Sequence, residues 1–272
     1  MKNEILAKFL PLIITLLILS TTIQVQAAEG WEEDFEGETI TTLEGKGWFF
    51  AAYEIIADIY TPENDHGHDV IDGILRTPFS SNGDNFTEAF QNNTIAYGTW
   101  KFDWAPAITP SGIEKREAVF FIANGDCDIS GIHIDNDPMN GYLLWISQTT
   151  AGAVRKIKLS RVDSPGFIDT ELGYNTLTPS VTGPIHIEIT RNRQGDFEVS
   201  LNDETIIEAI DNEINESTYF GFNSHVGDTG IDNITIEENS IPAFPVGFII
   251  CTVTPTVIVL VIRKKRIILK KE

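Results

Sequence analysis

The chain has 272 residues, of which 40 are acidic and 19 are basic, and its formal net charge is −21. Eight of the basic residues flank two terminal apolar runs, so the region between these runs holds 11 basic and 38 acidic residues, a net charge of −27. Such a charge repels phosphate backbones and excludes nucleic acid as the expected partner, and two cysteines are too few for a disulfide framework.

The first 27 residues have the pattern of a secretory signal peptide. Lys2 and Lys8 precede an apolar run at residues 9–19, which is too short to span a bilayer comfortably. A Val-Gln-Ala triplet at residues 25–27 follows, and it is typical of a cleavage site. We predict cleavage after Ala27, with an uncleaved anchor as the alternative.

The segment that follows has a weak structural signal. Residues 48–60 are compatible with a pair of strands, whereas residues 64–93 are predicted to be long polar loops. Glu32, Asp34 and Glu36 have the period of two that places carboxylates on one face of a strand. The same spacing is expected on any solvated strand, so we interpret these three residues as a solvated edge rather than a catalytic group.

From residue 94 onward, short segments alternate apolar and polar residues and are separated by Gly, Pro, Asn and Asp. This pattern predicts β-strands with one packed and one solvated face. In residues 185–191, for example, three isoleucines alternate with His186, Glu188 and Thr190. So many strands favour two packed antiparallel sheets. The predicted strands are residues 94–104, 117–123, 131–135, 142–147, 154–162, 185–191, 197–201, 205–209, 219–223 and 231–237.

The second apolar run, residues 244–262, contains no charge and is long enough, at about 1.5 Å per residue, to cross a hydrocarbon core. Residues 263–266 are Arg-Lys-Lys-Arg, and a basic cluster of this kind stays on the cytoplasmic side. We therefore predict a single-pass protein of the cell membrane with its acidic part outside. The predicted organisation is a signal peptide at 1–27, an extracytoplasmic domain at 28–240, a transmembrane helix at 241–262 and a basic cytoplasmic tail at 263–272.

Four Asn-x-Ser/Thr triplets fall in the portion predicted to be outside the cell, where asparagine-linked glycosylation takes place. Such triplets also arise by chance in chains rich in Asn and Thr, so they agree with this topology without establishing it. The candidate glycosylation sites are Asn85, Asn92, Asn215 and Asn233.

Three motifs resemble strands of a known fold family. Residues 97–103 read Tyr-Gly-Thr-Trp-Lys-Phe-Asp, residues 219–222 read Tyr-Phe-Gly-Phe, and residues 230–236 read Gly-Ile-Asp-Asn-Ile-Thr-Ile. They are similar to the early and final strands of concanavalin A-like jelly rolls, a group that includes laminin G-like modules and laminarinase-type glycoside hydrolases. The resemblance covers about residues 31–237 and implies an all-β fold, a two-sheet antiparallel β-sandwich.

For an active laminarinase-type hydrolase, the resemblance implies a Glu-x-Asp-x-(x)-Glu motif on a strand soon after the Tyr-Gly-x-Trp segment. Such a motif holds the nucleophile and the acid about 5 Å apart. Neither residues 117–123 nor residues 131–135 contain it, and the similar spacing at residues 32–36 lies at the start of the predicted domain. We therefore expect a module without catalytic residues.

Counting the predicted strands as antiparallel assigns the loops to two ends of the sandwich. Loops 136–141, 163–184 and 224–230 are predicted to share the outer end, whereas loops 124–130, 148–153, 192–195 and 210–218 share the end that faces the membrane. Carboxylate and amide oxygens at the outer end are candidate ligands for Ca²⁺, which prefers several such oxygens. The candidate metal ligands are Asp135, Asn136, Asp137 and Asp228.

Aromatic rings are the second type of candidate residue, because sugars stack on exposed aromatic faces. For Trp145, packing in the core beside Leu143 is the alternative, since the two residues share a strand face. The candidate ligand-binding residues are His133, Trp145, Phe167, Tyr174 and His225.

These features together favour a membrane-anchored recognition or adhesion module at the cell surface. It would bind a glycan or a surface protein, with help from Ca²⁺. Two alternatives stay open. Release of reducing sugar would favour an anchored glycoside hydrolase or polysaccharide lyase, and lateral assembly without a ligand would favour a structural envelope protein.

Overall fold

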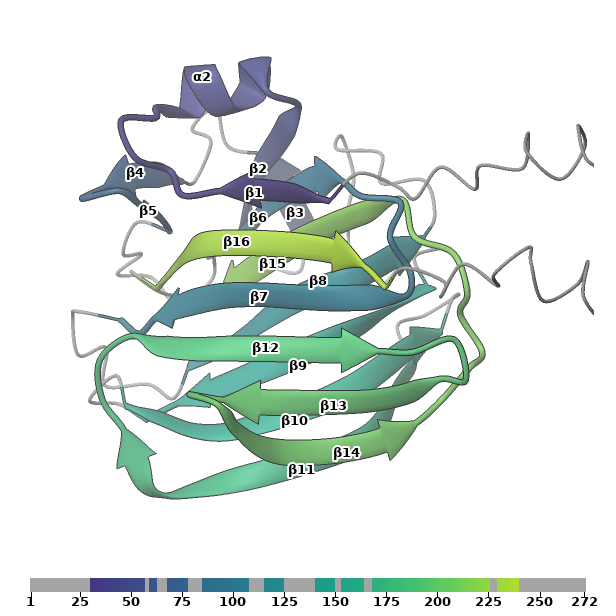
Figure 1. Ribbon diagram of the computed structural model, residues 1–272. Helices are drawn as coiled ribbons and strands as arrows, with labels where there is room; N and C mark the ends of the chain where they lie inside the picture. Colours follow the sequence, from purple (N-terminus) through teal and green to yellow (C-terminus); the bar gives the residue numbers. More distant parts are fainter. Residues whose placement is uncertain are drawn as a thin grey trace, which may run out of the picture. The chain divides into compact units, whose positions relative to one another are not determined.

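Two antiparallel sheets, each of eight strands, pack face to face in the computed structural model (Figure 1). This is the two-sheet sandwich that the alternating strands predict. All described residues belong to one compact unit, residues 28–239. Within them, no helix has the length and apolar character needed to cross a membrane, and the predicted signal peptide and transmembrane helix lie outside them. The described residues are 30–56, 59–62, 68–77, 85–107, 115–124, 140–149, 153–163, 168–225 and 229–239.

The first sheet has the strand order β14-β13-β12-β7-β16-β5-β4, and β1 also pairs with β16. In Figure 1 this sheet lies in front, with β16, β7, β12, β13 and β14 following one another down the picture. Its strands are β1 (Trp31–Glu33), β4 (Asp69–Ile71), β5 (Ile74–Arg76), β7 (Gly98–Ala105), β12 (Ile185–Arg191), β13 (Asp196–Leu201), β14 (Glu204–Ile210) and β16 (Gly230–Glu238).

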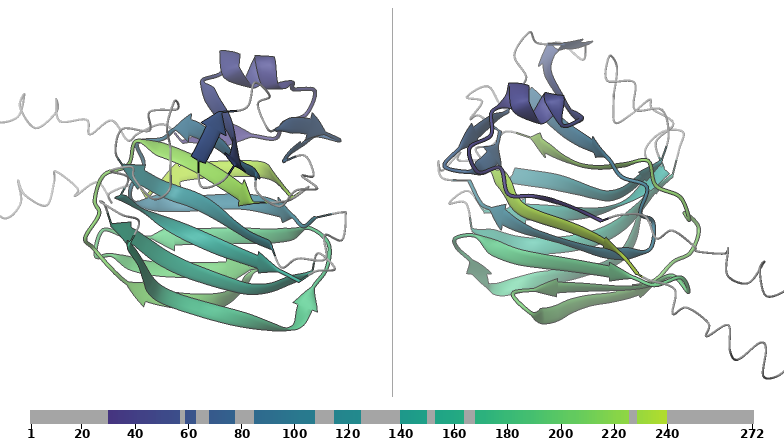
Figure 2. Two further views of the ribbon diagram at one scale, coloured as in Figure 1. Left: turned by 180° about the vertical axis from the view of Figure 1, so that it is seen from behind. Right: turned by 45° about the horizontal axis from the view of Figure 1, so that its top comes forward.

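The second sheet has the strand order β11-β10-β9-β8-β15-β6-β2-β3. Figure 2, left, views the molecule from the side of this sheet. Its strands are β2 (Trp48–Ile56), β3 (Ile59–Pro62), β6 (Asn85–Asn92), β8 (Lys115–Asn124), β9 (Asn140–Gln148), β10 (Val154–Asp163), β11 (Ile168–Val181) and β15 (Tyr219–His225). The short helix α2 (Ile40–Gly45) precedes β2.

The core lies between the two sheets and is built by the alternation that the sequence displays. In β7, every second residue from Trp100 is an aromatic, and Trp100, Phe102 and Trp104 are fully buried. The isoleucines of β12 face them across the strand pair, with Ile187 opposite Phe102 and Ile189 opposite Trp100. Each such ring removes about 150 to 250 Å² from water, and this burial is the main force that holds the sheets together.

Two segments that the sequence analysis predicted to be loops contain strands instead. Residues 64–93 were predicted to be loops, but they include β4, β5 and β6, and β6 lies between β15 and β2 in the second sheet. Its polar residues belong to the sheet itself, since Glu88 lies opposite Asn223. The loop predicted at residues 163–184 is largely β11, an edge strand with a register shift beside Leu159 that interrupts its period of two.

The assignment of loops to the two ends of the sandwich also needs correction. β8 and β9 are antiparallel neighbours, with Asn124 opposite Asn140, whereas the prediction counted a strand at 131–135 between them and so made them parallel. Residues 131–135 lie outside the described residues. The ends of β8 and β9 at Asn124 and Asn140 lie at the same end as Thr218, whose backbone N–H donates to the carbonyl of Ala123 at 2.7 Å.

We call this the C-terminal end, because the last described residue, Asn239, also lies there and donates its backbone N–H to the carbonyl of Tyr97. The opposite end, the far end, holds the last residues of β9 and β15 and the start of β12. The connections at 125–139 and 164–167 therefore leave from the C-terminal end, whereas those at 149–153 and 226–229 leave from the far end.

Candidate functional site

The outer face of the second sheet carries a cluster of apolar side chains that is separate from the core. In β9, Leu144 and Ile146 point into the core between the sheets, while Leu143 and Trp145 point the other way. Leu143 is fully buried in this second cluster and Trp145 is partly buried. The remaining members of the cluster are Phe90, Ala118, Phe120, Ala123, Val162 and Tyr219.

Three accessible residues form one row across neighbouring strands of this outer face. Lys158 of β10 lies opposite Trp145 of β9 on one side and opposite Tyr174 of β11 on the other. Tyr174 is 57% exposed. The Nζ of Lys158 is 5.6 Å from the centroid of the Trp145 ring, and the Nζ of Lys156 is 4.2 Å from the centroid of the Tyr174 ring. Each ammonium group therefore lies within the range of a cation–π contact.

The next row toward the far end is polar and accessible. Lys156 lies opposite Ser147 of β9 and Thr176 of β11, and all three are at least partly exposed. We call these two rows the Trp145 platform. It consists of Trp145, Ser147, Lys156, Lys158, Tyr174 and Thr176.

The row of Trp145 continues across the second sheet, through β8, to a buried polar pair on β15 and β6. Ala118 lies opposite Trp145, Asn223 opposite Ala118, and Glu88 opposite Asn223. The Nδ2 of Asn223 donates to Oε1 of Glu88 at 3.0 Å, and both residues are almost completely buried. The outer face therefore combines a buried polar and apolar centre with an accessible aromatic and cationic flank.

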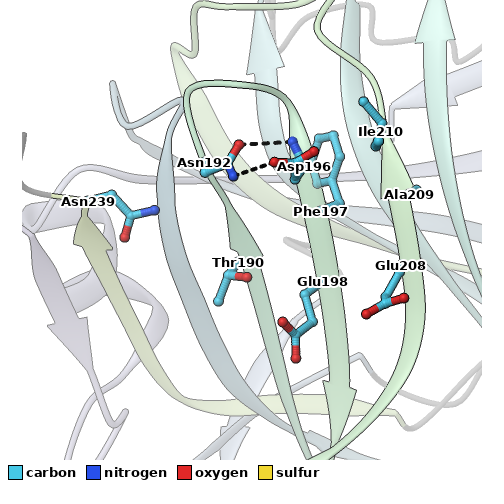
Figure 3. Close-up of a pocket in the computed structure, with 9 residues that line it drawn as sticks. All are labelled: Thr190, Asn192, Asp196, Phe197, Glu198, Glu208, Ala209, Ile210 and Asn239. Carbon is cyan, nitrogen blue, oxygen red and sulfur yellow. Dashed lines mark hydrogen bonds between the residues drawn. The ribbon is translucent and has the colours of Figure 1, made fainter.

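The outer face of the first sheet has a different chemistry. A hollow of about 460 Å³ lies over β12, β13 and β14, and it is lined by carboxylates, amides and a hydroxyl group (Figure 3). Glu198 of β13 and Glu208 of β14 lie directly opposite each other, so their Cβ atoms are about 4.5 to 5.5 Å apart. The turn beside them is fixed by Asn192, whose Oδ1 accepts the backbone N–H of Asp196 at 3.0 Å.

A group of carboxylates lies on the same face toward the far end. Asp103 of β7 accepts a hydrogen bond from Nδ2 of Asn233 at 2.9 Å, and its other oxygen is 2.8 Å from Nδ1 of His186. The backbone N–H of Asn233 donates to Asp232 at 2.7 Å. Burial raises the pKa of Asp232, and the nearby charges of Asp103, Glu36 and Asp34 raise it further, against the lowering effect of that backbone hydrogen bond.

Replacing Asp232 with asparagine is expected to raise the melting temperature at neutral pH. A carboxyl whose pKa is raised in the folded state above its ordinary value of 3.8 destabilises the fold when it is ionised. That penalty is fully present above the raised pKa, and it disappears as the pH falls toward 3.8. Melting curves of both proteins across this range test the sign. Glu213→Gln, the same charge change in an exposed connection, should not move the midpoint with this pH dependence.

The predicted metal residues Asp135, Asn136, Asp137 and Asp228 lie outside the described residues. Within the described parts of the chain, no group of three or more His, Cys, Asp or Glu side chains is arranged to hold a metal ion. The strand ends that border the first three are at the C-terminal end, whereas those that border Asp228 are at the far end. The prediction that all four residues lie at one end of the sandwich was therefore wrong. Ca²⁺ binding stays a prediction.

The predicted ligand-binding residues are only partly described. His133 and Phe167 lie outside the described residues, and the backbone of His225 ends β15 at the far end. Trp145 and Tyr174 lie on one face of the second sheet, on either side of Lys158, because β9 and β11 both pair with β10. The sequence analysis did not select Lys156 and Lys158, although their period of two in a strongly acidic chain was a visible signal.

The carboxylates at residues 32–36 do not form the strand face that their spacing suggested. β1 ends at Glu33, and Phe35 has a positive φ of 54°. Only Glu32 lies on the strand, opposite Thr235, while Oδ1 of Asp34 accepts the backbone N–H of Glu36 in the turn that follows. The expectation of three aligned carboxylates was therefore wrong.

The four sequons have different environments. Asn92 and Asn215 are exposed, and the backbone of Asn85 begins β6. Asn233 is also exposed, but its Nδ2, the atom that a glycan would modify, donates to Asp103 and Asp232. Glycosylation at all four stays a prediction.

Comparison with known proteins places the fold. No family model matches the chain, and no curated protein matches its sequence. The structure is similar to the carbohydrate recognition domain of Emp46p, with a TM-score of 0.54 and 9% identity over 76% of this chain and 95% of that one. It is also similar to a Bacillus subtilis protein described as having a galectin-like fold, with a TM-score of 0.50 and 13% identity over 78% of this chain and 97% of that one.

A structure described as a native glycosidic hydrolase matches with a TM-score of 0.49 and 12% identity over 78% of this chain and 97% of that one, which is too distant to bear on activity. Together with the two antiparallel sheets, these similarities show that the chain has the concanavalin A-like jelly-roll fold. They concern the fold alone.

Proposed function

We propose that this chain is a membrane-anchored recognition module of the cell surface that binds a glycan on the Trp145 platform. The observation that supports it best is the row in which Lys158 lies between Trp145 and Tyr174 on the outer face of the second sheet. An aromatic face packs against the C–H groups of a sugar ring, while neighbouring Ser, Thr and Lys donors reach its hydroxyl oxygens. The structural relative described as a carbohydrate recognition domain adds support from its name.

The anchored topology in this proposal rests on the sequence. The signal peptide pattern, the uncharged run at 244–262 and the basic cluster after it support display of the domain outside the cell. The Trp145 platform lies toward the far end, whereas Asn239, the last described residue, lies at the C-terminal end. Digestion of intact producing cells with protease should remove the domain, and its survival beside accessible controls would contradict surface display.

A binding screen tests glycan recognition directly. The full chain in detergent micelles, applied to an array of polysaccharides and oligosaccharides, should bind at least one class of glycan above the signal of empty micelles. Running each array in millimolar Ca²⁺ and in chelator tests Ca²⁺ assistance, which would appear as binding that the chelator abolishes. Binding to cell-surface protein but to no glycan would contradict the glycan proposal.

A glycoside hydrolase is the second candidate function, and one observation favours it. Glu198 and Glu208 lie opposite each other in the hollow of the first sheet, and glycosidases use a pair of carboxyl groups that flank the scissile bond. Release of reducing ends from mixed polysaccharides that disappears in Glu198→Gln or Glu208→Gln would favour this function. Release that persists in both variants would exclude this carboxylate pair as its source.

A further inference from the structure

The basic residues of the acidic region are unevenly distributed over the fold. Only 11 basic residues accompany 38 acidic ones between the two terminal apolar runs. Six of the 11 lie in two strands of the second sheet, β8 and β10. They are Lys115, Arg116, Arg155, Lys156, Lys158 and Arg161.

The strand register places the backbone positions of three of these basic residues at or beside the Trp145 platform. Lys156 and Lys158 belong to it, and Arg116 lies opposite Ser147, in the same row as Lys156. Adjacent strands are about 4.8 Å apart and residues two apart along a strand are about 7 Å apart. The three backbone positions therefore span about 10 Å across the strands and about 7 Å along them, which is the size of one or two sugar rings.

These two rows contain no acidic residue on the four strands from β8 to β11. The partners of Lys156 across the sheet are Ser147 and Thr176, and those of Lys158 are Trp145 and Tyr174. Asp169, on β11 toward the C-terminal end, forms an ion pair with Lys158. Asp169 thus offsets part of the charge of Lys158, whereas the cross-strand partners of Lys156 are uncharged, in a region whose net charge is −27.

We infer that the Trp145 platform selects glycans that carry carboxylate groups, such as those that contain uronic acids. This inference rests on the proposed function and names the ligand class of the same site. Lysine ammonium groups beside an aromatic surface fit a sugar ring that stacks on Trp145 or Tyr174 and points its carboxylate at Lys156 or Lys158. Salt screens charges beyond about 8 Å at physiological ionic strength, so for a single carboxylate Lys156, Lys158 and Asp169 count for more than the distant negative charge of the domain.

The ligand is expected to carry spaced rather than dense charge. A densely charged polyanion extends beyond the platform and meets the acidic surface of the rest of the domain, where it is repelled. Neutral sugars between the charged ones avoid this cost and still provide stacking faces. A polymer that alternates uronic acid with a neutral sugar has this pattern.

Matched pairs of polymers test this inference on the full chain in micelles. Hyaluronan, alginate and polygalacturonate are compared with their fully methyl-esterified forms, which keep the sugar rings and lose the charge, and with neutral dextran and β-glucans. We expect at least one free acid to bind about tenfold more tightly than its ester, and this preference should shrink as salt is raised from 50 to 500 mM, as screening requires.

Substitutions test whether the preference for the free acid arises at the Trp145 platform. Lys156→Met/Lys158→Met keeps the aliphatic stems and should remove the preference for the free acid, whereas Lys101→Met, on the first sheet where Lys101 pairs with Glu188, should keep it. Melting curves show whether each variant is folded. Tyr174→Phe gives a second variant at the site with its charge unchanged, and it should keep the preference.

The outcomes separate this inference from the proposed function. If esters and neutral glycans bind as tightly as the acids, the charge selection is overturned while glycan recognition stands. The same holds if the acid preference survives in the folded double lysine variant. If neither these polymers nor the wider glycan array binds, the proposed function fails, and the inference fails with it.

Discussion

Replacing Arg191 with leucine is expected to lower the free energy of unfolding by about 3 to 5 kcal/mol, the range for removing one partner of a buried charged network. Arg191 is fully buried at the end of β12, where its guanidinium donates to the carbonyl of Ala96 at 3.0 Å and to that of Asp211 at 3.3 Å. Leucine leaves these carbonyls without their donor. The rings of Tyr97, Tyr142 and Phe197 surround the guanidinium, with centroids 4.7, 4.6 and 5.0 Å from Cζ.

The network around Arg191 joins the two sheets at the C-terminal end. Burial raises the pKa of the Tyr142 hydroxyl, as does Asp211, so this hydroxyl stays protonated and donates to the Asp211 carboxylate. Arg161 of β10 pairs with the same carboxylate. Tyr142 belongs to the second sheet and Arg191 to the first, so the loss of Arg191 weakens the contact between them.

Urea unfolding followed by tryptophan fluorescence measures this effect, because Trp100 and Trp104 are fully buried in the folded state. Arg193→Leu is the matched control. Arg193 is exposed and pairs with Glu238 at 3.5 Å, so its removal should cost less than about 1 kcal/mol. Arg191→Lys should fall between the two, because lysine keeps the charge but lacks the planar fork of donors. A loss below 1 kcal/mol for Arg191→Leu would contradict the role assigned to this network.

Replacing Trp145 with alanine is expected to weaken binding of the glycan identified in the screen by at least about 30-fold, which corresponds to the 2 kcal/mol typical of a central aromatic contact. The indole provides the largest aromatic surface on the platform, and alanine removes the whole stacking face. Trp145→Phe keeps an aromatic ring and should retain most of the affinity. Isothermal titration calorimetry with the glycan measures both variants.

Stability measurements separate binding from folding. Trp145 is partly buried on the outer face, whereas Trp100 is fully buried between the sheets. Trp100→Ala should therefore cost about 3 to 5 kcal/mol of unfolding free energy, and Trp145→Ala clearly less. A folded Trp145→Ala variant that binds the glycan as tightly as the native chain would exclude the platform as the binding site.

Much of the fold could be predicted because its central strands obey a strict period of two. β12 has the bounds that its alternating isoleucines predicted, and β7, β13 and β16 follow from their apolar spacing. β6 was missed because residues on both of its faces are buried, so its sequence does not alternate between apolar and polar residues. Glu88, for example, is a buried charged residue in this strand. In β11 the register shift near Leu159 breaks the alternation, and local sequence alone does not reveal the neighbour that keeps it in the sheet.

The candidate site could be predicted only in part for a related reason. The stacking of sugars on exposed aromatic rings pointed to Trp145 and Tyr174, but which residues share a face across three strands depends on register. Register is set by long-range pairing that is not written in any one segment. The count of strands before β9 was also wrong, which assigned the loops near Asp135 and Asp228 to the same end.

The position of β16 determines how the domain responds to mechanical load. β16 lies inside the first sheet, where β7 pairs with it along one edge and β1 and β5 pair with it along the other. β16 ends at Glu238, next to the last described residue, Asn239. Tension applied there shears all of these backbone hydrogen bonds at once instead of unzipping them one after another. A strand held in this way resists detachment strongly under a load applied along its axis.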